Sequence, residues 1–493
     1  MAPSSTTRII SQEGLRLDRK QQIQGMQSLV YWVLRDWCVL DRSSRLPGPA
    51  NISWCLFTVQ SQKVRMKSSI TIWLGIIAFA AAQTTPDAQI SLSDIANSAA
   101  TTEPYSPVSY VEGLAFNRFF QVWFENIDFE DAAADSNLQW LASQGIALTN
   151  LFAVTHPSEP NYCAAAGGDT FGMDNDGFQR VPANVSTIVD LLDTKYISWG
   201  EYQEHLPYPG FQGFNYSNQE TYADDYVRKH NPLILYDSIT KNSMRLRQIK
   251  NFTHFENDLT NRKLPQWAFF TPNMTNDAHD TNITFAAKWL RGWISPLLTN
   301  DYFMNDTLVL ITFDEDKTYR KTNRIFSILL GGAVSDHLRG TQDDTFYTHY
   351  SVIASVSANW GLPSLGRWDC GANILEIVAN KTGYVNSNVN TTHLTLNQTY
   401  PGPLSNGQLS KFSPIWPNPV TDAKCSAGHG VLDIVKRTYA GTEPSYNYTS
   451  PFPYDTKSGY NVGVMATPRS FALLCVISTA MPILPGVIWL LDT

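Results

Sequence analysis

The sequence predicts an α/β fold built on a mostly parallel sheet, with helices on both faces. Apolar runs of strand length alternate along the chain with segments of helical periodicity, as in a parallel sheet whose strands are connected by helices. Four of the apolar runs also end abruptly in acids, amides, histidine or serine. Because ligands of open α/β sheets bind beyond the carboxyl ends of the strands, we expect the functional site at that edge.

The elements follow in order along the chain. An apolar strand over 119–124 ends at Glu125-Asn126, and a second strand from Ile146 to Val154 leads to Ser158. The aromatic region 205–232 predicts a long loop or insertion that faces the substrate. The remaining pattern predicts helices over 134–144, 185–194, 284–298 and 351–360, and strands over 196–200, 266–271, 307–313 and 325–330.

Ser158 lies where a strand gives way to a run of small residues closed by Gly167-Gly168. Pro160 fits the first turn of a helix, and the glycines fit its end. This pattern predicts a strand, a tight turn and a helix, with Ser158 at or near the helix N-cap. Such a serine could attack or anchor an anion, although an ordinary capping serine has the same local pattern.

Oxygen-bearing side chains follow two further strands. Glu125 and Asn126 end one of them, and Asp314 and Glu315 end the other. Carboxylate and amide oxygens suit a divalent cation such as Mg²⁺, Ca²⁺ or Mn²⁺, whereas Zn²⁺ prefers sites with histidine or cysteine. A cation beside Ser158 would lower the pKa of its hydroxyl and neutralise phosphate oxygens. An acidic pair at a strand end is otherwise a solvated turn.

Four more residues are candidates for substrate chemistry. Asn161, one helical turn after Ser158, could donate a hydrogen bond to an oxyanion. His279 and His349 could bind phosphate or protonate a leaving alcohol. Asp280 could fix the tautomer of His279 or add a ligand. His156 is interpreted as a support of the turn and is left out of the chemistry.

Targeting signals suggest secretion. Residues 66–82 have the parts of a signal peptide, with a basic start, an apolar run and a small-x-small cleavage pattern ending at Ala82. We therefore expect 1–65 to be a gene-model extension or a disordered arm, and 83–113 to be a linker. The catalytic domain is expected over 114–460. The apolar tail 461–493 resembles a GPI-attachment signal, with a membrane helix as the alternative.

The rest of the chain fits a glycosylated surface. Only 16% of residues are charged, and the formal net charge of −8 argues against nucleic acid as a partner. In an oxidising compartment we expect a Cys370–Cys425 disulfide and a buried Cys163. Asn-x-Ser/Thr sequons, which predict N-linked glycans, begin at Asn184, Asn215, Asn251, Asn273, Asn282, Asn305, Asn380, Asn390, Asn397 and Asn447.

Five motifs, at 124–126, 156–162, 272–280, 311–315 and 348–351, together resemble the phosphoesterase family, in particular its fungal phosphate-repressible acid phosphatases. The resemblance implies an alkaline-phosphatase-like fold and a covalent phosphoserine mechanism on small phosphoesters, with secretion or cell-surface attachment. By position it implies that Ser158 is the nucleophile. It implies one metal ion, Mg²⁺, Ca²⁺, Mn²⁺ or Zn²⁺, held by Glu125, Asn126, Asp314 and Glu315. It also implies phosphate-pocket or acid–base roles for Asn161, His279, Asp280 and His349.

Two other functions fit parts of the pattern. One is a phospholipase C-type phosphodiesterase acting on membrane lipids, but the region 205–232 shows no amphipathic membrane helix. The other is a non-catalytic glycosylated protein of the cell surface, which the completeness of the polar set argues against. Phosphate-monoester hydrolysis, in the service of phosphate scavenging, is the function that the sequence favours.

Overall fold

The computed structural model describes residues 90–392, 394–400, 402–406 and 416–446. The chain divides into two compact units, Met1–Thr85 and Pro86–Thr493, and every described residue belongs to the second. The extension 1–65, the signal peptide 66–82, the tail 461–493 and the sequon at Asn447 lie outside the described residues. Within the described part, a search for a helix long and apolar enough to cross a bilayer finds none.

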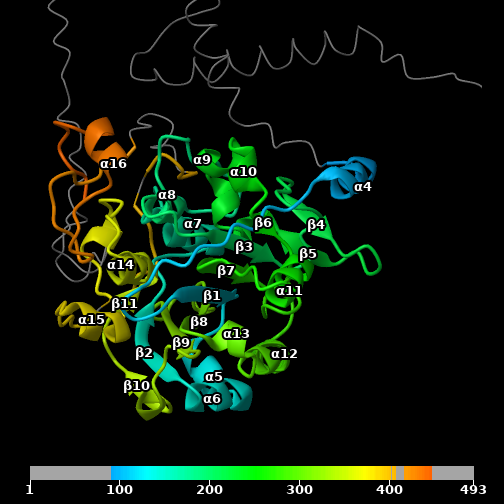
Figure 1. Ribbon diagram of the computed structural model, residues 1–493, viewed down its shortest axis with the longest axis horizontal. Helices are drawn as coiled ribbons and strands as arrows, with labels where there is room; N and C mark the ends of the chain where they lie inside the picture. Colours follow the sequence, from blue (N-terminus) through cyan, green and yellow to red (C-terminus); the bar gives the residue numbers. More distant parts are fainter. Residues whose placement is uncertain (1–89, 393, 401, 407–415, 447–493) are drawn as a thin grey trace, which may run out of the picture. The chain divides into compact units, whose positions relative to one another are not determined.

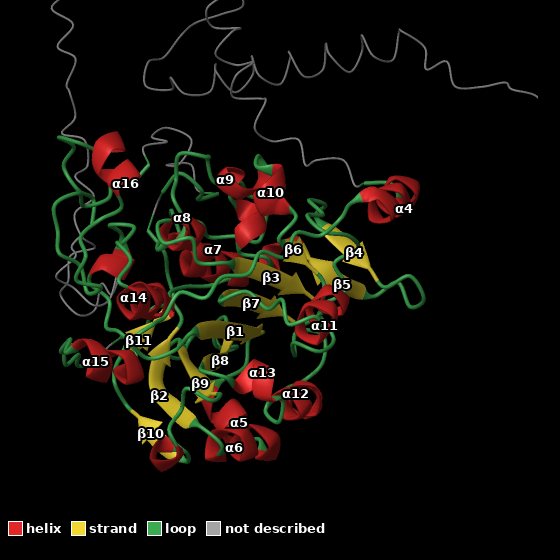
Figure 2. Ribbon diagram, viewed as in Figure 1, coloured by secondary structure: helices red, strands yellow, loops and turns green. Residues whose placement is uncertain are grey.

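A mostly parallel sheet of nine strands forms the centre of the described unit (Figures 1 and 2). Its strands lie in the order β10-β2-β9-β8-β1-β7-β3-β6, and β11 also pairs with β2, in parallel. Only β9 runs antiparallel to its neighbours within this sheet. The predicted α/β class is therefore confirmed. The strands are β1 Arg118–Phe124, β2 Ile146–Phe152, β3 Trp199–Gln203, β6 Ile249–Lys250, β7 Trp267–Thr271, β8 Thr307–Phe313, β9 Arg324–Leu330, β10 Thr341–Asp343 and β11 Tyr347–Thr348.

Helices cover both faces of the sheet (Figure 2). In β1, the Trp123 ring packs on Tyr162 of α7, while the next side chain, Phe124, packs on Trp289 of α12. Burial on both faces explains why the central strands read as continuous apolar runs. The helices are α4 Leu92–Thr101, α5 Phe129–Ala134, α6 Ser136–Ser143, α7 Ser158–Gly167, α8 Ile188–Asp193, α9 Asp237–Thr240, α10 Ser243–Leu246, α11 Phe252–Thr260, α12 Ile283–Leu297, α13 Asp301–Met304, α14 His349–Trp360, α15 Glu376–Thr382 and α16 Asp433–Thr438.

The predicted helix after Ser158 is present as α7, and all of its residues are buried. It begins at Ser158 itself, after Pro157 in extended conformation, and ends at Gly168. Gly168 has φ 74°, the left-handed conformation that glycine adopts without steric strain. The small residues of α7 allow α14 to pack closely beside it. Because α7 is buried on all sides, it has no solvent-exposed polar face.

The region 205–232 is more ordered than a loop. It contains an antiparallel hairpin of β4 Asn215–Ser217 and β5 Asp224–Val227, followed by a 3₁₀ turn over Arg228–His230. The sequence pattern missed this hairpin because its strands are short and partly exposed. The expected Cys370–Cys425 disulfide is formed, and Cys163 is buried with its thiol 3.2 Å from the Tyr236 hydroxyl.

Parallel pairing aligns the strand ends that carry the predicted site residues. Phe124 of β1 lies opposite Phe313 of β8 in register, and the Asp314 N–H donates to the Phe124 carbonyl at 2.9 Å. On the other side of β1, the Glu125 N–H donates to the Asp277 carbonyl at 2.9 Å. Three segments far apart in the sequence therefore meet at one edge of the sheet.

Candidate active site

Ser158 lies at the amino end of α7 and is 2% exposed. Asn161 holds the turn before it: the Asn161 amide nitrogen donates to the carbonyls of Thr155 at 2.9 Å and Pro157 at 3.2 Å, and its oxygen accepts from the Val154 N–H at 3.0 Å. Both amide hydrogens are engaged within the turn. Asn161 therefore braces the turn, and an oxyanion contact would require it to give up one of these bonds.

Three buried carboxylates, Glu125, Asp314 and Glu315, form what we call the carboxylate cluster. The Ser158 hydroxyl lies 3.2 Å from Glu125 Oε2 and 3.4 Å from Glu315 Oε1. Asn126 completes the predicted set, since its Nδ2 donates to Glu315 Oε1 at 3.2 Å. The structure thus brings the strand ends of β1 and β8 together at Ser158.

Asp314 is the least balanced member of the carboxylate cluster. It is fully buried, and among the described residues neither carboxylate oxygen has a hydrogen bond of standard geometry. Burial, reinforced by the charges of Glu125 and Glu315, raises its pKa well above the usual range, although the nearby Ser158 hydroxyl favours the charged form. Like charges buried together require a counter-charge. Unpaired oxygens from Asp314 beside those of Glu125 and Glu315 fit a hard divalent cation.

The opposite side of Glu125 faces His230. His230 Nε2 lies 3.0 Å from Glu125 Oε1, and its Nδ1 lies 3.5 Å from Asp277 Oδ2. Tyr162 donates its hydroxyl to the same Glu125 oxygen at 2.6 Å. Burial lowers the pKa of His230, but the two carboxylates outweigh it and raise the value. Burial likewise opposes the charge on Glu125, yet His230, Lys229 and His279 lower its pKa to about 2.

Glu125, His230 and Asp277 also form a possible metal site of their own. One ligand atom from each lies within 4.8 Å of the others, and all three residues are buried. Glu125 therefore borders two candidate positions for a cation, one beside Ser158 and one at His230. At the second position, a protonated His230 supplies positive charge without any metal.

His279 and Asp280 lie at the mouth of the site. His279 Nδ1 is 2.8 Å from Asp280 Oδ1, and the His279 side chain is 30% exposed. Its Nε2 lies 3.3 Å from the Lys229 ammonium, which also contacts Asp176 at 3.3 Å. We call Lys229, His230 and His279 the basic cluster. Asp280 orients His279, which is one of the two roles expected from the sequence.

His349 lies behind the carboxylate cluster. Its Nε2 donates to the backbone carbonyl of Asp314 at 2.6 Å, and its ring packs 4.3 Å from the Trp123 ring. Burial lowers its pKa to about 4, so the imidazole is neutral at mildly acidic pH. The structure places His349 where it positions Asp314, with its donor nitrogen already engaged.

The sequence reading missed several residues that the structure places here. His156 Nδ1 contacts Glu315 Oε2 at 2.5 Å, and the ring stacks on Tyr319. Lys229 and His230 lie in the region 205–232, which the sequence predicts as a loop or insertion. One feature of the sequence indicates Lys229 and His230: they are two adjacent basic residues, followed by Asn231-Pro232, in a region that is otherwise rich in aromatic residues. Asp277 lay within a motif whose chemistry was assigned to its neighbours.

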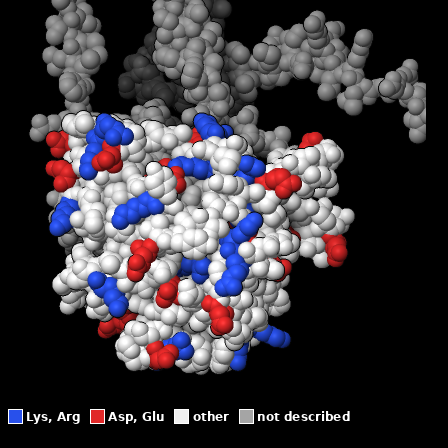
Figure 3. All heavy atoms as spheres, viewed as in Figure 1, with Lys and Arg blue, Asp and Glu red and all other residues white. Residues whose placement is uncertain are grey.

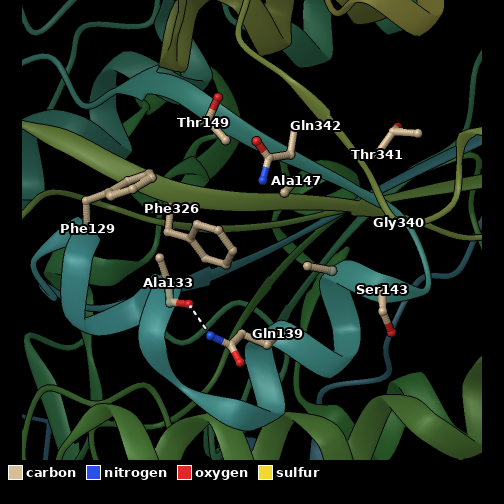
Figure 4. Close-up of a pocket in the computed structure, with 11 residues that line it drawn as sticks. Phe129, Ala133, Gln139, Ser143, Ala147, Thr149, Phe326, Gly340, Thr341 and Gln342 are labelled. Carbon is tan, nitrogen blue, oxygen red and sulfur yellow. Dashed lines mark hydrogen bonds between the residues drawn. The ribbon is translucent and has the colours of Figure 1, made fainter.

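A pocket of about 430 Å³ elsewhere in the unit does not include these groups. It lies between α5, α6 and the strands β2, β9 and β10 (Figure 4), and its lining includes Phe129, Phe326 and Gln139. The Gln139 amide donates to the Ala133 carbonyl at 3.1 Å. Since none of the lining side chains is titratable, the pocket offers no acid–base or metal chemistry.

Comparison with known proteins finds similarity to phosphoesterases and to acid phosphatases. A family model described as "Phosphoesterase family" matches residues 128–363. The chain is 75% identical over 405 residues to an acid phosphatase of Aspergillus fumigatus, covering 82% of this chain and 91% of that one. It is 58% identical over 412 residues to a phosphate-repressible acid phosphatase of Penicillium chrysogenum, covering 84% and 98%. A solved alkaline phosphatase superfamily protein from Vibrio parahaemolyticus is similar at TM-score 0.34 and 11% identity, covering 54% and 73%.

Proposed function

The chain belongs to the phosphoesterase family and is similar over most of its length to fungal acid phosphatases, and from that premise we propose that it is a secreted acid phosphatase that hydrolyses phosphate monoesters through a phosphoserine. Its relatives' names support a phosphoric ester hydrolase. One observation carries the mechanism: the Ser158 hydroxyl lies between Glu125 and Glu315, beside the unpaired Asp314. A serine surrounded by excess buried negative charge fits a site that is completed by a cation.

We assign the cation to the serine side of Glu125. Glu125, Asn126, Asp314 and Glu315 would hold it through oxygen atoms, which suits Mg²⁺, Ca²⁺ or Mn²⁺ and is also compatible with Zn²⁺. When bound, such an ion stabilises the deprotonated serine and the negative charge of the phosphoryl group. The unpaired oxygens of Asp314 are the observation that supports this assignment over the His230 position.

In the first chemical step, Ser158 loses its proton to the carboxylate cluster, and Oγ attacks phosphorus in line with the leaving alcohol. The Oγ–P bond forms as the bond from phosphorus to the leaving oxygen breaks. When the phosphate takes over the Lys229 ammonium, His279 Nε2 is free to be protonated, and His279, held by Asp280, gives that proton to the leaving oxygen. The Lys229 ammonium, which lies 3.3 Å from His279 Nε2, binds the phosphate oxygens.

In the second step, water attacks the phosphoserine. His279 takes the proton from the water, a new O–P bond forms, and the Oγ–P bond breaks as Oγ recovers its proton from the carboxylate cluster. Inorganic phosphate is released and the Ser158 hydroxyl is restored. His349 takes no part in proton transfer. It is a positioning residue, because its Nε2 donates to the backbone carbonyl of Asp314 and holds that residue in place. Asn161 acts in the same way on the turn that presents Ser158.

The cellular setting is part of the same proposal. Secretion or attachment at the cell surface, glycosylation and a role in phosphate scavenging follow from the predicted signal peptide and sequons. Acidic and basic side chains are interspersed on the face shown in Figure 3, and the formal net charge is −8, so nucleic acid is not proposed as a partner. A membrane contact is proposed only through a GPI anchor.

The test is hydrolysis by the purified protein across pH 3–8. 4-Nitrophenyl phosphate is compared with the diester bis(4-nitrophenyl) phosphate and with phosphatidylcholine. We expect monoester hydrolysis at acid pH, reduced by chelation and restored by a divalent cation. Preferred turnover of the diesters would favour the phospholipase C alternative, and no turnover of any ester would favour a non-catalytic surface protein.

The nucleophile is tested by Ser158→Ala, with the exposed Ser143→Ala as control. Loss of Oγ should lower kcat by at least about 10³-fold, while Ser143→Ala retains wild-type turnover. Acid quenching during turnover of a ³²P-labelled monoester should leave label on the peptide that contains Ser158. Label on another residue, or full activity of Ser158→Ala, would contradict the assignment.

A further inference from the structure

Tyr319 is an exposed aromatic residue held beside the site, in the loop over 316–323 that connects β8 to β9. It is 54% exposed. Its ring stacks on the buried His156 ring, with centroids 4.0 Å apart and planes at 23°. His156 covers one face of the ring, so the exposed area belongs to the rest of the side chain.

The loop that carries Tyr319 is fixed by side chains from elsewhere in the fold. Asn397 Nδ2 donates to the backbone carbonyls of Tyr319 at 2.8 Å and Lys321 at 2.6 Å. Thr318 Oγ1 and Lys321 Nζ both donate to Asp128 Oδ2, at 2.8 and 2.7 Å. A loop fixed at its backbone and at two side chains loses little further entropy when a ligand binds.

Contacts lead directly from Tyr319 to the nucleophile. His156, which stacks on Tyr319, contacts Glu315 at 2.5 Å, and Glu315 lies 3.4 Å from the Ser158 hydroxyl. Burial first, and then the charges of Glu315, Asp176 and Asp314, raise the pKa of Tyr319 to about 12. Tyr319 is thus the exposed member of a series of contacts that begins at Ser158, and it lies on a side from which the organic part of a bound ester could leave the pocket.

We propose that Tyr319 is a specificity residue, a preorganised platform on which the flat ring of an aryl phosphate monoester stacks. The inference rests on the proposed function and adds to it the class of preferred substrate. Aromatic stacking favours flat groups and contributes nothing to a small aliphatic alcohol. The phosphoryl group is held by the residues around Ser158, and Tyr319 contacts only the leaving group.

The experiment compares kcat/KM for 1-naphthyl phosphate with that for glycerol 2-phosphate in the same protein. Tyr319→Ala should lower the ratio of the two values by about 5-fold, mainly through KM for the aryl ester. Tyr319→Phe keeps the ring and should retain the wild-type ratio within about twofold. The inhibition constant of inorganic phosphate should stay unchanged, because phosphate has no leaving group.

Equal losses on both esters in Tyr319→Ala would overturn the proposal, since they would mean that Tyr319 only supports His156. An unchanged ratio would overturn it too. Asn397→Ala, which releases the loop while keeping the ring, should lower the ratio less than Tyr319→Ala. Failure of the proposed function is distinguishable, because the wild-type protein would then hydrolyse neither ester.

Discussion

The two sides of Glu125 carry similar numbers of charged groups but balance them differently. On the histidine side, Tyr162 and His230 both contact Glu125 Oε1, and His230 also approaches Asp277. On the serine side, the His156 ring contacts Glu315. The buried Asp314 carboxylate, in contrast, has no hydrogen bond of standard geometry among the described residues. An imidazole thus contacts a carboxylate on each side, but the serine side has one more buried carboxylate, Asp314, without a partner, and this is where we propose the cation.

This difference explains the opposite pKa directions of neighbouring carboxyl groups. All lie within the same buried site, so burial alone cannot distinguish them. Cationic neighbours lower the pKa of Glu125 to about 2 despite burial, whereas burial and anionic neighbours raise that of Asp314. A cation bound on the serine side would reverse the direction at Asp314, which makes this residue the most sensitive point of the comparison.

Asp314→Asn should have the largest effect. The substitution replaces the carboxylate by a neutral amide. This loss of a negatively charged oxygen ligand should abolish tight metal binding and lower kcat by at least about 10³-fold. In metal-free protein the same change should raise the free energy of unfolding by roughly 1–3 kcal/mol, because it removes an unpaired buried charge. Elemental analysis, kinetics and urea unfolding in chelator measure the three effects.

The matched variant on the other side is Asp277→Asn, which removes a partner of His230 and should destabilise the metal-free protein. If the two variants change the free energy of unfolding of the metal-free protein in opposite directions, the two sides of Glu125 differ in charge balance as described. If Asp314→Asn retained both its metal and its turnover, the serine side would not be the metal site.

His230→Ala tests the internal cation and should have the next largest effect. It leaves Glu125 and Asp277 buried without their shared partner, which should destabilise the protein by about 3–5 kcal/mol. Turnover should fall by about 10²-fold, while the bound metal remains. The half-buried His254 on α11 offers a control, since His254→Ala removes an imidazole far from the carboxylate cluster. Loss of the metal from His230→Ala would instead assign the ion to Glu125, His230 and Asp277.

His349→Gln should have a smaller effect, visible in the pH dependence of stability. Burial lowers the folded-state pKa of His349 to about 4, below an unfolded value of about 6.5. The unfolded chain therefore binds more protons between these values, so His349 contributes stability that is present above pH ~6.5 and lost as the pH falls toward 4. The variant should lose less stability over this interval in unfolding experiments.

The same variant separates positioning from proton transfer. A glutamine can still donate to the Asp314 carbonyl, so we expect a modest loss of turnover and an unchanged shape of the kcat profile against pH. Loss of one limb of that profile would show that His349 itself carries the proton. His279→Gln is the counterpart that should lose the limb.

The sequence was sufficient for the parts of the molecule that are organised by periodicity. The central strands are apolar on both faces, and polar residues follow them without a transition, as at Phe124 and Phe313. Their parallel pairing then brings Glu125, Ser158 and Asp314 to one edge. These features depend on local pattern and on a general property of parallel sheets.

The rest depends on contacts that have no local pattern. His230 comes to Glu125 through a short 3₁₀ turn after a partly exposed hairpin, and neither element has a strong periodicity. The roles of Asn161 and His349 follow from the backbone carbonyls to which their side-chain nitrogens donate hydrogen bonds. A sequence identifies an amide or imidazole near a site, but only the fold shows that its donors are already used.

At two sequons, Asn273 and Asn397, the side-chain nitrogen that would carry a glycan is engaged in contacts within the fold. Asn273, which precedes Asp277 on the histidine side, is 6% exposed and has its amide nitrogen 3.1 Å from His205 Nδ1. Asn397, on the serine side, uses its nitrogen to hold the loop of Tyr319. A glycan on either nitrogen would break these bonds. The exposed sequons are Asn184, Asn282, Asn305, Asn380 and Asn390.

We therefore expect peptide mapping of protein expressed through a fungal secretory pathway to find glycans at exposed sequons and none at Asn273 or Asn397. Asn305→Gln, which changes an exposed sequon, should alter mass without altering turnover. Asn397→Gln should leave the glycan mass unchanged and slightly raise KM for an aryl ester, since the longer side chain misplaces the amide that holds Tyr319. A glycan found at Asn397 would mean that the loop is held differently in the mature protein, and the serine side would then lose its fixed aromatic platform while the histidine side stayed intact.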